Sequence, residues 1–389
     1  ELAESFEYGL NASAKKFDGS NKYIRITDID DISHKFNQSG VTSPDIDFAS
    51  ADNYKLKKGD ILFARTGASV GKTYMYRESD GLVYYAGFLI RARIKSKISS
   101  EFVFQTTFTD SYNRFIKITS QRSGQPGVNA EEYSNFKIMI PNYEEQNAIG
   151  CFFKKIDDTI TLHQRKLDLL KETKKGFLQK MFPKNGAKVP EIRFPGFTED
   201  WEERKLNEGM TEYTDRVYIQ DDEIYKQVSV KNVGEITLRG EQIGSKIGRK
   251  RQAKVNLIEH PDTLIFTRQT IEQGGIGFAP KETDGAIVTE NMPTIDVDND
   301  IINCNYLLAY VKTEDWYRKV ILKNIEGGTA QIAIHEDSIL FSEVLIPKIE
   351  EQQKIGAFFK QLDDTITLHQ RKLDLLKETK KGFLQKMFV

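Results

Sequence analysis

The sequence has little cysteine, no excess of charge of either sign and no long apolar run. Its 389 residues include 2 cysteines, Cys151 and Cys304, which can form neither a disulfide framework nor, alone, a four-ligand zinc site. Lysine and arginine (56) nearly balance aspartate and glutamate (57), which argues against coating nucleic acid by bulk charge but permits local basic patches. Uncharged apolar runs such as residues 81–90 are shorter than the roughly 18–20 residues of a membrane-spanning helix. We therefore expect a soluble, cytoplasmic protein of two or three domains.

The motifs of the major catalytic classes are also missing. The segment Gly67–Thr73, GASVGKT, resembles a nucleotide-binding P-loop, but only three residues separate its glycines where the P-loop has four. The five histidines have no metal-ligand spacing, and we find no GxGxxG, HExxH, GxSxG or nuclease carboxylate pattern. We predict no catalytic, metal-binding or cofactor-binding residue in this chain.

A long internal repeat is the strongest feature present. Residues 157–182, DDTITLHQRKLDLLKETKKGFLQKMF, recur unchanged at 363–388, and over 144–182 only five positions differ from their counterparts. Steps of four and three between the apolar positions predict a long helix with a coiled-coil seam. The predicted seam residues are Ile156, Ile160, His163, Leu167 and Leu170 in the first copy and Leu362, Ile366, His369, Leu373 and Leu376 in the second.

Two polar residues interrupt this seam in each copy, His163 and Lys174 in the first. We interpret them as specifying register or as marking a partly wet seam. A metal site at the histidines is disfavoured, because no second ligand lies one helical turn away from either. Chain connectivity favours antiparallel helices, since a parallel pair would require the second block to span the whole length of the rod.

The order along the chain is variable block, helix, variable block, helix. The predicted boundaries are 1–143 for the first block, 144–182 for its helix, 183–203 for a linker, 204–349 for the second block and 350–389 for its helix. The blocks are not similar in sequence, and each consists of short β-rich runs between Gly, Asn and Asp turns. The predicted fold class is α+β, with two β-rich α/β domains at opposite ends of an antiparallel two-helix coiled coil and an approximate two-fold axis.

This arrangement is more typical of an adaptor than of an enzyme. A helix present twice offers the same surface to two copies of one partner, whereas two unlike blocks should bind two different ligands or two parts of one. Reading duplex DNA requires Arg, Lys, Gln and hydroxyl groups at base edges and phosphates, and several Gly-rich loops carry that chemistry. Taken singly, each loop is also an ordinary surface turn. The candidate DNA-binding residues are Arg65, Thr66, Gly67, Ser69, Lys72, Tyr74, Arg122, Ser123 and Gln125 in the first block, and Arg249, Lys250, Arg268, Gln269, Thr270, Thr329 and Gln331 in the second.

The chain resembles the specificity subunit of Type I restriction–modification systems over essentially its whole length. The most specific segments are GDILFARTGASVGK at Gly59, SGQPGVNAEEYSNFKIMIPNYEEQ at Ser123, DGAIVTENMP at Asp284 and RFPGFTEDWEERKL at Arg193. One departure is that no RFPGF…W segment precedes ELAESF as one precedes KLNEGM. The sequence therefore does not establish a complete chain.

The resemblance implies that each block is a target recognition domain that reads one half of a bipartite site in double-stranded DNA. It also implies that the helices set the distance between the half-sites and dock two methyltransferase (modification) subunits. Those partners would bind S-adenosylmethionine and carry the catalytic residues, and a translocating restriction subunit would join the larger complex. This chain itself would have no cofactor.

A second interpretation uses the same helices without DNA. In it, the chain is a coiled-coil scaffold that carries two different ligand-binding modules, and Arg65, Gln125, Arg268 and Gln331 have no role. A P-loop enzyme is a third interpretation, and it depends only on the imperfect GASVGKT match.

Overall fold

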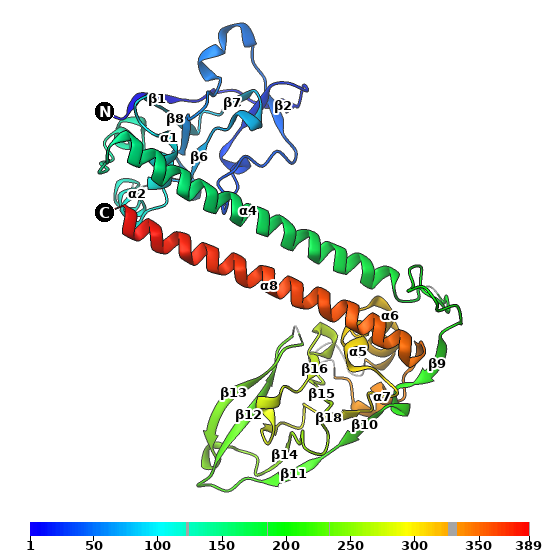
Figure 1. The fold of residues 1–389 in the computed structure, drawn as a ribbon. Helices are drawn as coiled ribbons and strands as arrows, with labels where there is room; N and C mark the ends of the chain where they lie inside the picture. The colour runs from blue at the N-terminus through cyan, green and yellow to red at the C-terminus, as the bar shows by residue number, and fades with distance from the viewer. Residues whose placement is uncertain (122–123, 185, 233, 326–332, 389) are drawn as a thin grey trace. The chain divides into compact units, whose positions relative to one another are not determined.

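The computed structural model describes residues 1–389 except 122–123, 185, 233, 326–332 and 389 (Figure 1). The chain divides into two compact units, which we call unit 1 (Glu1–Lys166 and His369–Val389) and unit 2 (Leu167–Leu368). Each unit contains one variable block and part of each repeat helix. Within the described residues, no helix is long and apolar enough to cross a membrane.

Both copies of the repeat form single helices. Helix α4 covers Tyr143–Lys180 and α8 covers Ile349–Met387. The predicted helices begin one residue late and end two residues late. Helix α4 stops shortly before Pro183, which has no amide hydrogen for a further helical turn.

In unit 1 the first part of α4 packs against the last part of α8. The rings of Phe152 and Phe383 meet edge to face with centroids 5.0 Å apart, and Lys380 Nζ lies 2.7 Å from Asp157 Oδ1. Nearest the middle of the helices, the Nδ1 atoms of His163 and His369 are 3.0 Å apart. In each of these contacts a residue nearer the start of α4 meets a residue nearer the end of α8. The predicted antiparallel pairing is therefore confirmed.

Unit 2 repeats these contacts with the roles of the helices exchanged. The rings of Phe177 and Phe358 lie 5.0 Å apart, and Lys174 forms an ion pair with Asp363. Each of these residues is the repeat counterpart of one in the unit 1 contacts. Of the ten predicted seam residues, Leu167 and Leu373 are buried and the other eight are partly buried.

Unit 1 contains two four-stranded sheets and three short helices. The first sheet has the order β1-β8-β5-β6, with only antiparallel pairs, and the second has the order β2-β4-β3-β7, in which β3 and β7 are parallel. The strands are β1 (Ala3–Tyr8), β2 (Ala14–Lys16), β3 (Lys22–Ile24), β4 (Thr42–Pro44), β5 (Ile61–Ala64), β6 (Thr73–Met75), β7 (Val83–Tyr85) and β8 (Leu89–Ile94), and the helices are α1 (Ser100–Thr106), α2 (Asp110–Thr119) and α3 (Ala130–Ser134).

Unit 2 contains sheets of four, five and two strands. Their orders are β10-β18-β15-β16, β11-β14-β17-β12-β13 and β19-β9. The strands are β9 (Glu202–Lys205), β10 (Met210–Tyr213), β11 (Asp215–Tyr218), β12 (Ile224–Val230), β13 (Ile236–Ile243), β14 (Arg251–Lys254), β15 (Thr263–Phe266), β16 (Ile276–Phe278), β17 (Ile287–Val288), β18 (Thr294–Val297) and β19 (Glu343–Ile346), and the helices are α5 (Cys304–Tyr310), α6 (Glu314–Trp316) and α7 (Glu336–Leu340).

The first sheet of each unit has the same topology. Strand β1 corresponds to β10, β8 to β18, β5 to β15 and β6 to β16, and every pair in both sheets is antiparallel. The sequence comparison of the two blocks did not predict this. A buried strand requires only an apolar run of suitable length, so two unlike sequences can satisfy the same sheet.

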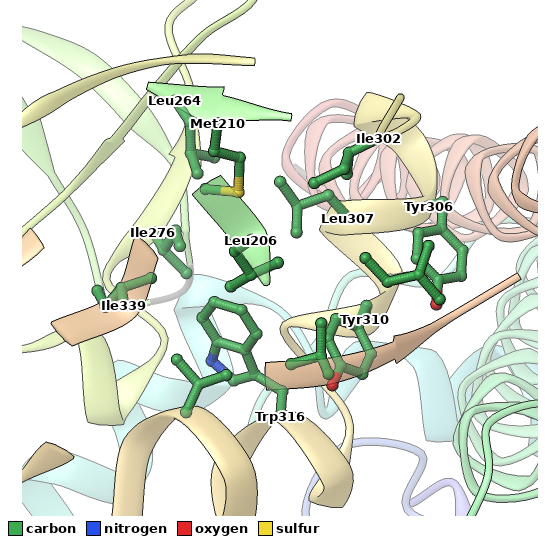
Figure 2. Packing of buried hydrophobic residues seen from close by; sticks show 14 of the residues in the cluster. Leu206, Met210, Leu264, Ile276, Ile302, Tyr306, Leu307, Tyr310, Trp316 and Ile339 are labelled. Atoms are coloured by element: carbon green, nitrogen blue, oxygen red, sulfur yellow. The ribbon is translucent and has the colours of Figure 1, made fainter. Parts of the chain in front are cut away.

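The core of unit 2 joins this sheet to the helices. Figure 2 shows Leu206, Met210 and Leu264 packed with Tyr306, Tyr310 and Trp316, all within one cluster of buried side chains. The same cluster includes Ile355 and Phe359 from the first turns of α8. The variable block and the helix start are therefore one packed body within unit 2.

Candidate nucleic-acid interface

Arg65 lies where the central strand β5 of unit 1 ends. Its backbone N–H donates to the carbonyl oxygen of Phe88 (3.1 Å), and its own carbonyl accepts from the N–H of Val128 (2.9 Å). The guanidinium lies over the ring of Tyr8, 5.0 Å from the centroid. A cation in this position is held by the ring face while its N–H groups stay available.

Arg268 occupies the same position in unit 2. Its backbone N–H donates to the carbonyl oxygen of Asn291 (3.0 Å), and its carbonyl accepts from the N–H of Ile334 (3.0 Å). Its side chain is held differently, because Nε and Nη2 donate to the two carboxylate oxygens of Glu336 at 2.8 and 2.6 Å. A bidentate pair of this kind fixes the guanidinium and neutralises its charge.

The difference follows from one position at the start of the helix after the loop. Glu336 is the first residue of α7, and Ala130 is the first residue of the corresponding helix α3. Within the described part of the chain, no carboxylate pairs with Arg65. Burial raises the pKa of Glu212, and the nearby carboxylate of Glu336 raises it further. The first block therefore has the more available arginine.

A tight glycine loop follows Arg65. Gly67 has φ +73°, and an added Cβ would lie 3.0 Å from Nε2 of Gln125, so glycine allows this exposed amide to approach the loop. Ser69 is partly exposed in the same loop, and Thr66 forms a β-bridge with Gly127. Arg65, Ser69 and Gln125 thus lie on this loop or next to it.

Two predicted residues of the first block face inward, contrary to the prediction. The side chain of Tyr74 is buried in the core, where its hydroxyl donates to Oδ2 of Asp80 (2.7 Å). Lys72 donates to the carbonyl of Ile29 (3.1 Å) and forms an ion pair with Asp31, with only 13% of its side chain exposed. Each polar group already has a partner within the domain, so neither is available to DNA. Strand β6 starts directly after Lys72, whereas a P-loop requires a helix there.

Unit 2 contains a cleft of about 500 Å³ that is lined by four arginines. These are Arg216, Arg249, Arg251 and Arg268. Arg249 forms an ion pair with Glu290, and Arg268 is held by Glu336. Among the residues that the structure describes, Arg216 and Arg251 have no acidic partner. Two unneutralised guanidinium groups in one cleft are suited to bind phosphate.

Strand pairing brings these two arginines together. Tyr218 of β11 lies directly opposite Arg251 of β14, and Arg216 is two residues before Tyr218. Residues two apart share a face of a strand, so both guanidinium groups emerge on the same side of the sheet. Sequence reasoning missed Arg216 and Arg251 as a pair because it searched loops, and the β11–β14 pairing is a long-range contact.

The remaining predicted residues of the second block are not gathered in this way. Lys250 forms an ion pair with Asp221 and donates to the carbonyl of Gly244 (2.8 Å). The hydroxyl of Thr270 is hydrogen-bonded to that of Thr267, and Gln269 is exposed outside the cleft. Four predicted residues, Arg122, Ser123, Thr329 and Gln331, lie outside the described residues.

No cluster of three or more potential metal ligands occurs in the part of the chain that the structure describes. What the site offers instead is paired arginines, amides and hydroxyls at the ends of strands. Two modules of related topology that present such groups and share a pair of helices define a modular nucleic-acid-binding protein.

Comparison with known proteins identifies the family. The model for the Type I restriction modification DNA specificity domain matches residues 6–172 and 185–378. The chain therefore belongs to this family, with two copies of the domain, and it is a DNA sequence-recognition subunit of the Type I restriction–modification class.

Individual relatives match most or all of the chain. A putative type I restriction enzyme MjaX specificity subunit from Methanocaldococcus jannaschii is 22% identical over 99% of this chain and 90% of its own length. The type I restriction enzyme MjaVIII specificity subunit of the same organism is 22% identical over 85% of this chain and 78% of its own. The crystal structure of a Type-I restriction-modification system S subunit from M. genitalium shares the fold, with a TM-score of 0.63 at 12% identity over 100% of this chain and 94% of the other.

Proposed function

We propose that each variable block reads one half of a bipartite DNA site. The carrying observation is that Arg65 and Arg268 occupy the same backbone position in two sheets of the same topology, in unlike surroundings. Arginine donates two parallel hydrogen bonds to guanine O6 and N7, the commonest specific contact in the major groove. One shared scaffold with different neighbours around the arginine is what two modules need to read two different sequences.

The arginine cleft of unit 2 would hold the DNA backbone. Arg216 and Arg251 have no carboxylate partner among the described residues, so a phosphate would be their counter-ion. The near-zero net charge of the chain agrees with local contacts of this kind. Much of the remaining grip on DNA would come from partner subunits.

The paired helices would dock two copies of a methyltransferase subunit. Unit 1 exposes Leu162 and Leu375, each at 67%, and unit 2 exposes their repeat counterparts Leu368 (53%) and Leu169 (66%). In the proposed complex a methyltransferase subunit would cover these leucines. The same surface present twice fits two copies of one partner. Those subunits would bind S-adenosylmethionine and carry the catalytic residues, and a translocating restriction subunit would join them.

Exchange of the second block tests independent recognition. Residues 204–349 are replaced by the second block of a related specificity subunit, and the chain is expressed with its methyltransferase partner. Sequencing of methylated sites should show that one half of the modified sequence changes and the other half stays the same. A change in both halves would contradict the proposal. A methylated sequence that stays the same after the exchange would favour the DNA-independent scaffold.

We also propose that the helices set the spacing of the half-sites. Seven residues inserted at equivalent positions of both repeats preserve the seam and add about 10.5 Å of helix at ~1.5 Å per residue. At roughly 3.4 Å per base pair, the unread spacer should lengthen by about three base pairs. The same methylation sequencing measures it, and an unchanged spacer would refute the role of the helices as a ruler.

A further inference from the structure

The carboxylate of Glu336 reaches Arg268 because the backbone of unit 2 brings the two residues together. The carbonyl oxygen of Arg268 accepts from the N–H of Ile334 at 3.0 Å, and the side chain of Ile334 is fully buried. Glu336 follows two residues later as the first residue of α7. The Nε and Nη2 atoms of Arg268 then lie 2.8 and 2.6 Å from its two carboxylate oxygens. The ion pair is therefore held by a buried backbone contact.

Glu336 engages only one edge of the Arg268 guanidinium. A guanidinium carries five N–H donors in a planar fork, and here Nε–H and one N–H of Nη2 are used. Both N–H groups of Nη1 and the second N–H of Nη2 remain, and such a pair matches guanine O6 and N7. Arg268 lines the arginine cleft, whereas Glu336 does not. Glu336 therefore holds the guanidinium from outside the cleft and leaves its outer edge free.

The ion pair also separates the hydrogen-bond donors of Arg268 from its charge. The side chains of Arg268 and Glu336 are only 21% and 14% exposed, so solvent screens their interaction little. Binding to phosphates depends on net positive charge, whereas reading a base edge depends on the placement of donors. A neutralised guanidinium with fixed donors is therefore better suited to a base than to a phosphate.

The first block has the same backbone arrangement without the carboxylate. The carbonyl oxygen of Arg65 accepts from the N–H of Val128 at 2.9 Å, and Ala130 follows two residues later, in the place of Glu336. The N–H of Ala130 donates to the hydroxyl of Tyr8 (3.2 Å), and the guanidinium of Arg65 lies over the Tyr8 ring. A ring face attracts a cation but does not fix the direction of its N–H groups. Arg65 therefore keeps both its charge and its rotational freedom.

We propose that Glu336 is a positioning residue that makes Arg268 a strict reader of one guanine, and that Ala130 leaves Arg65 a more tolerant reader. This inference rests on the proposed reading of DNA by each block. A guanidinium held along one edge cannot turn towards the acceptors of another base pair, so a wrong base leaves its donors unpaired. A guanidinium held only by a ring face can turn to a second acceptor or to a phosphate.

The test measures the affinity of the complex, assembled with its methyltransferase subunits, for duplexes that differ at single base pairs. Arg268→Ala first identifies the base pair that this arginine reads. Glu336→Gln should then lower discrimination at that base pair by about fivefold or more. It should also steepen the slope of log affinity against log salt concentration by up to about 0.9, because Arg268 gains net charge for a phosphate.

Asp337→Asn is the matched control, because it removes the same charge from the next residue, which is exposed. It should leave discrimination and slope unchanged. A purely structural role of Glu336 would weaken binding to matched and mismatched duplexes alike and would not steepen the slope. That result, or unchanged discrimination in Glu336→Gln, would overturn the proposal.

The reciprocal change places the carboxylate in the first block. Ala130→Glu should raise discrimination at the base pair that Arg65 reads by about fivefold, and Ala130→Gln should not. Addition of Arg65→Ala should abolish the gain, and a melting temperature within a few degrees of the parent shows that the variants are folded. No gain in folded Ala130→Glu would contradict the proposal.

The two levels of the argument fail in different ways. If Arg268→Ala alters discrimination at no base pair, the proposed reading of DNA by the second block is wrong. If Arg268→Ala alters one base pair and Glu336→Gln does not, only the positioning role of Glu336 is wrong.

Discussion

Arginine is held in two ways at the equivalent positions of the two blocks. Arg65 rests on the Tyr8 ring, whereas Arg268 is fixed by Glu336. An arginine without a carboxylate can give both of its donor pairs to a base, while one that is already paired must share or exchange its partner. The two side chains are the same, but more hydrogen-bond donors of Arg65 than of Arg268 are available to DNA.

Arg65→Ala should therefore relax recognition in one half-site only. Loss of a bidentate contact to a base costs about 1–3 kcal/mol of discrimination at one base pair. Methylation sequencing with the partner subunits measures it, and Arg268→Ala should alter the other half-site. Loss of discrimination in both halves with Arg65→Ala alone would contradict the assignment of one block to each half.

Arg216→Ala and Arg251→Ala should weaken binding to all DNA sequences equally. A lost phosphate contact lowers the slope of log affinity against log salt concentration by about 0.9 per arginine. The slope is measured by titrating duplex DNA into the assembled complex at several salt concentrations. Arg239→Ala, which removes an exposed arginine outside the cleft, is the matched control and should leave the slope unchanged.

The histidine pair makes stability depend on pH. The Nδ1 atoms of His163 and His369 are 3.0 Å apart. Burial, followed by the positive charge of His163, lowers the pKa of His369 below its ordinary value of 6.5. A lowered pKa in the folded state means that this contribution is complete above about pH 6.5 and is lost as the pH falls below it.

We expect the melting temperature to fall between about pH 7 and about pH 5.5, and to fall less in a His163→Gln, His369→Gln variant. Thermal unfolding followed by circular dichroism measures both. His34 is partly buried, and this burial lowers its pKa as well, so a smaller decline should remain in the variant. An equal decline in both proteins would contradict a contribution of His369 in this range.

Each repeat supplies both partners of the charged contacts that pair the helices, one aspartate and one lysine. Asp157 meets Lys380 in unit 1, and Lys174 meets Asp363 in unit 2. The side chains of Lys174 and Lys380 are only 15% and 14% exposed, so these pairs are less screened than surface ion pairs. Charges placed this way favour one register of the two helices.

A double-mutant cycle of Lys174→Met and Asp363→Asn should give a coupling energy of roughly 0.5–3 kcal/mol. Urea unfolding of the four proteins measures it. The exposed pair Lys154–Asp158, at i and i+4 of α4, is the control and should couple by about 0.5 kcal/mol or less. Equal coupling in both pairs would remove the argument that the seam charges specify register.

For the whole molecule, the sequence predicted the helices well and the recognition surface poorly. The helix bounds and the seam follow from a repeat whose periodicity is local, and the antiparallel pairing follows from chain connectivity. The shared sheet order, the pairing of Arg216 with Arg251 and the inward turn of Tyr74 depend on contacts between residues far apart in the chain. A pattern of residue types shows that a loop is polar. It does not show which side chains form hydrogen bonds or ion pairs within the domain.

The helix contacts have a consequence for chains with only one repeat. Residues 144–182 contain both Asp157 and Lys174, together with the histidine that meets its own counterpart. A half-length protein therefore holds both sides of every seam contact and can pair with an identical molecule. Such a homodimer would carry the same reader twice, and its target would be a palindrome interrupted by unread bases.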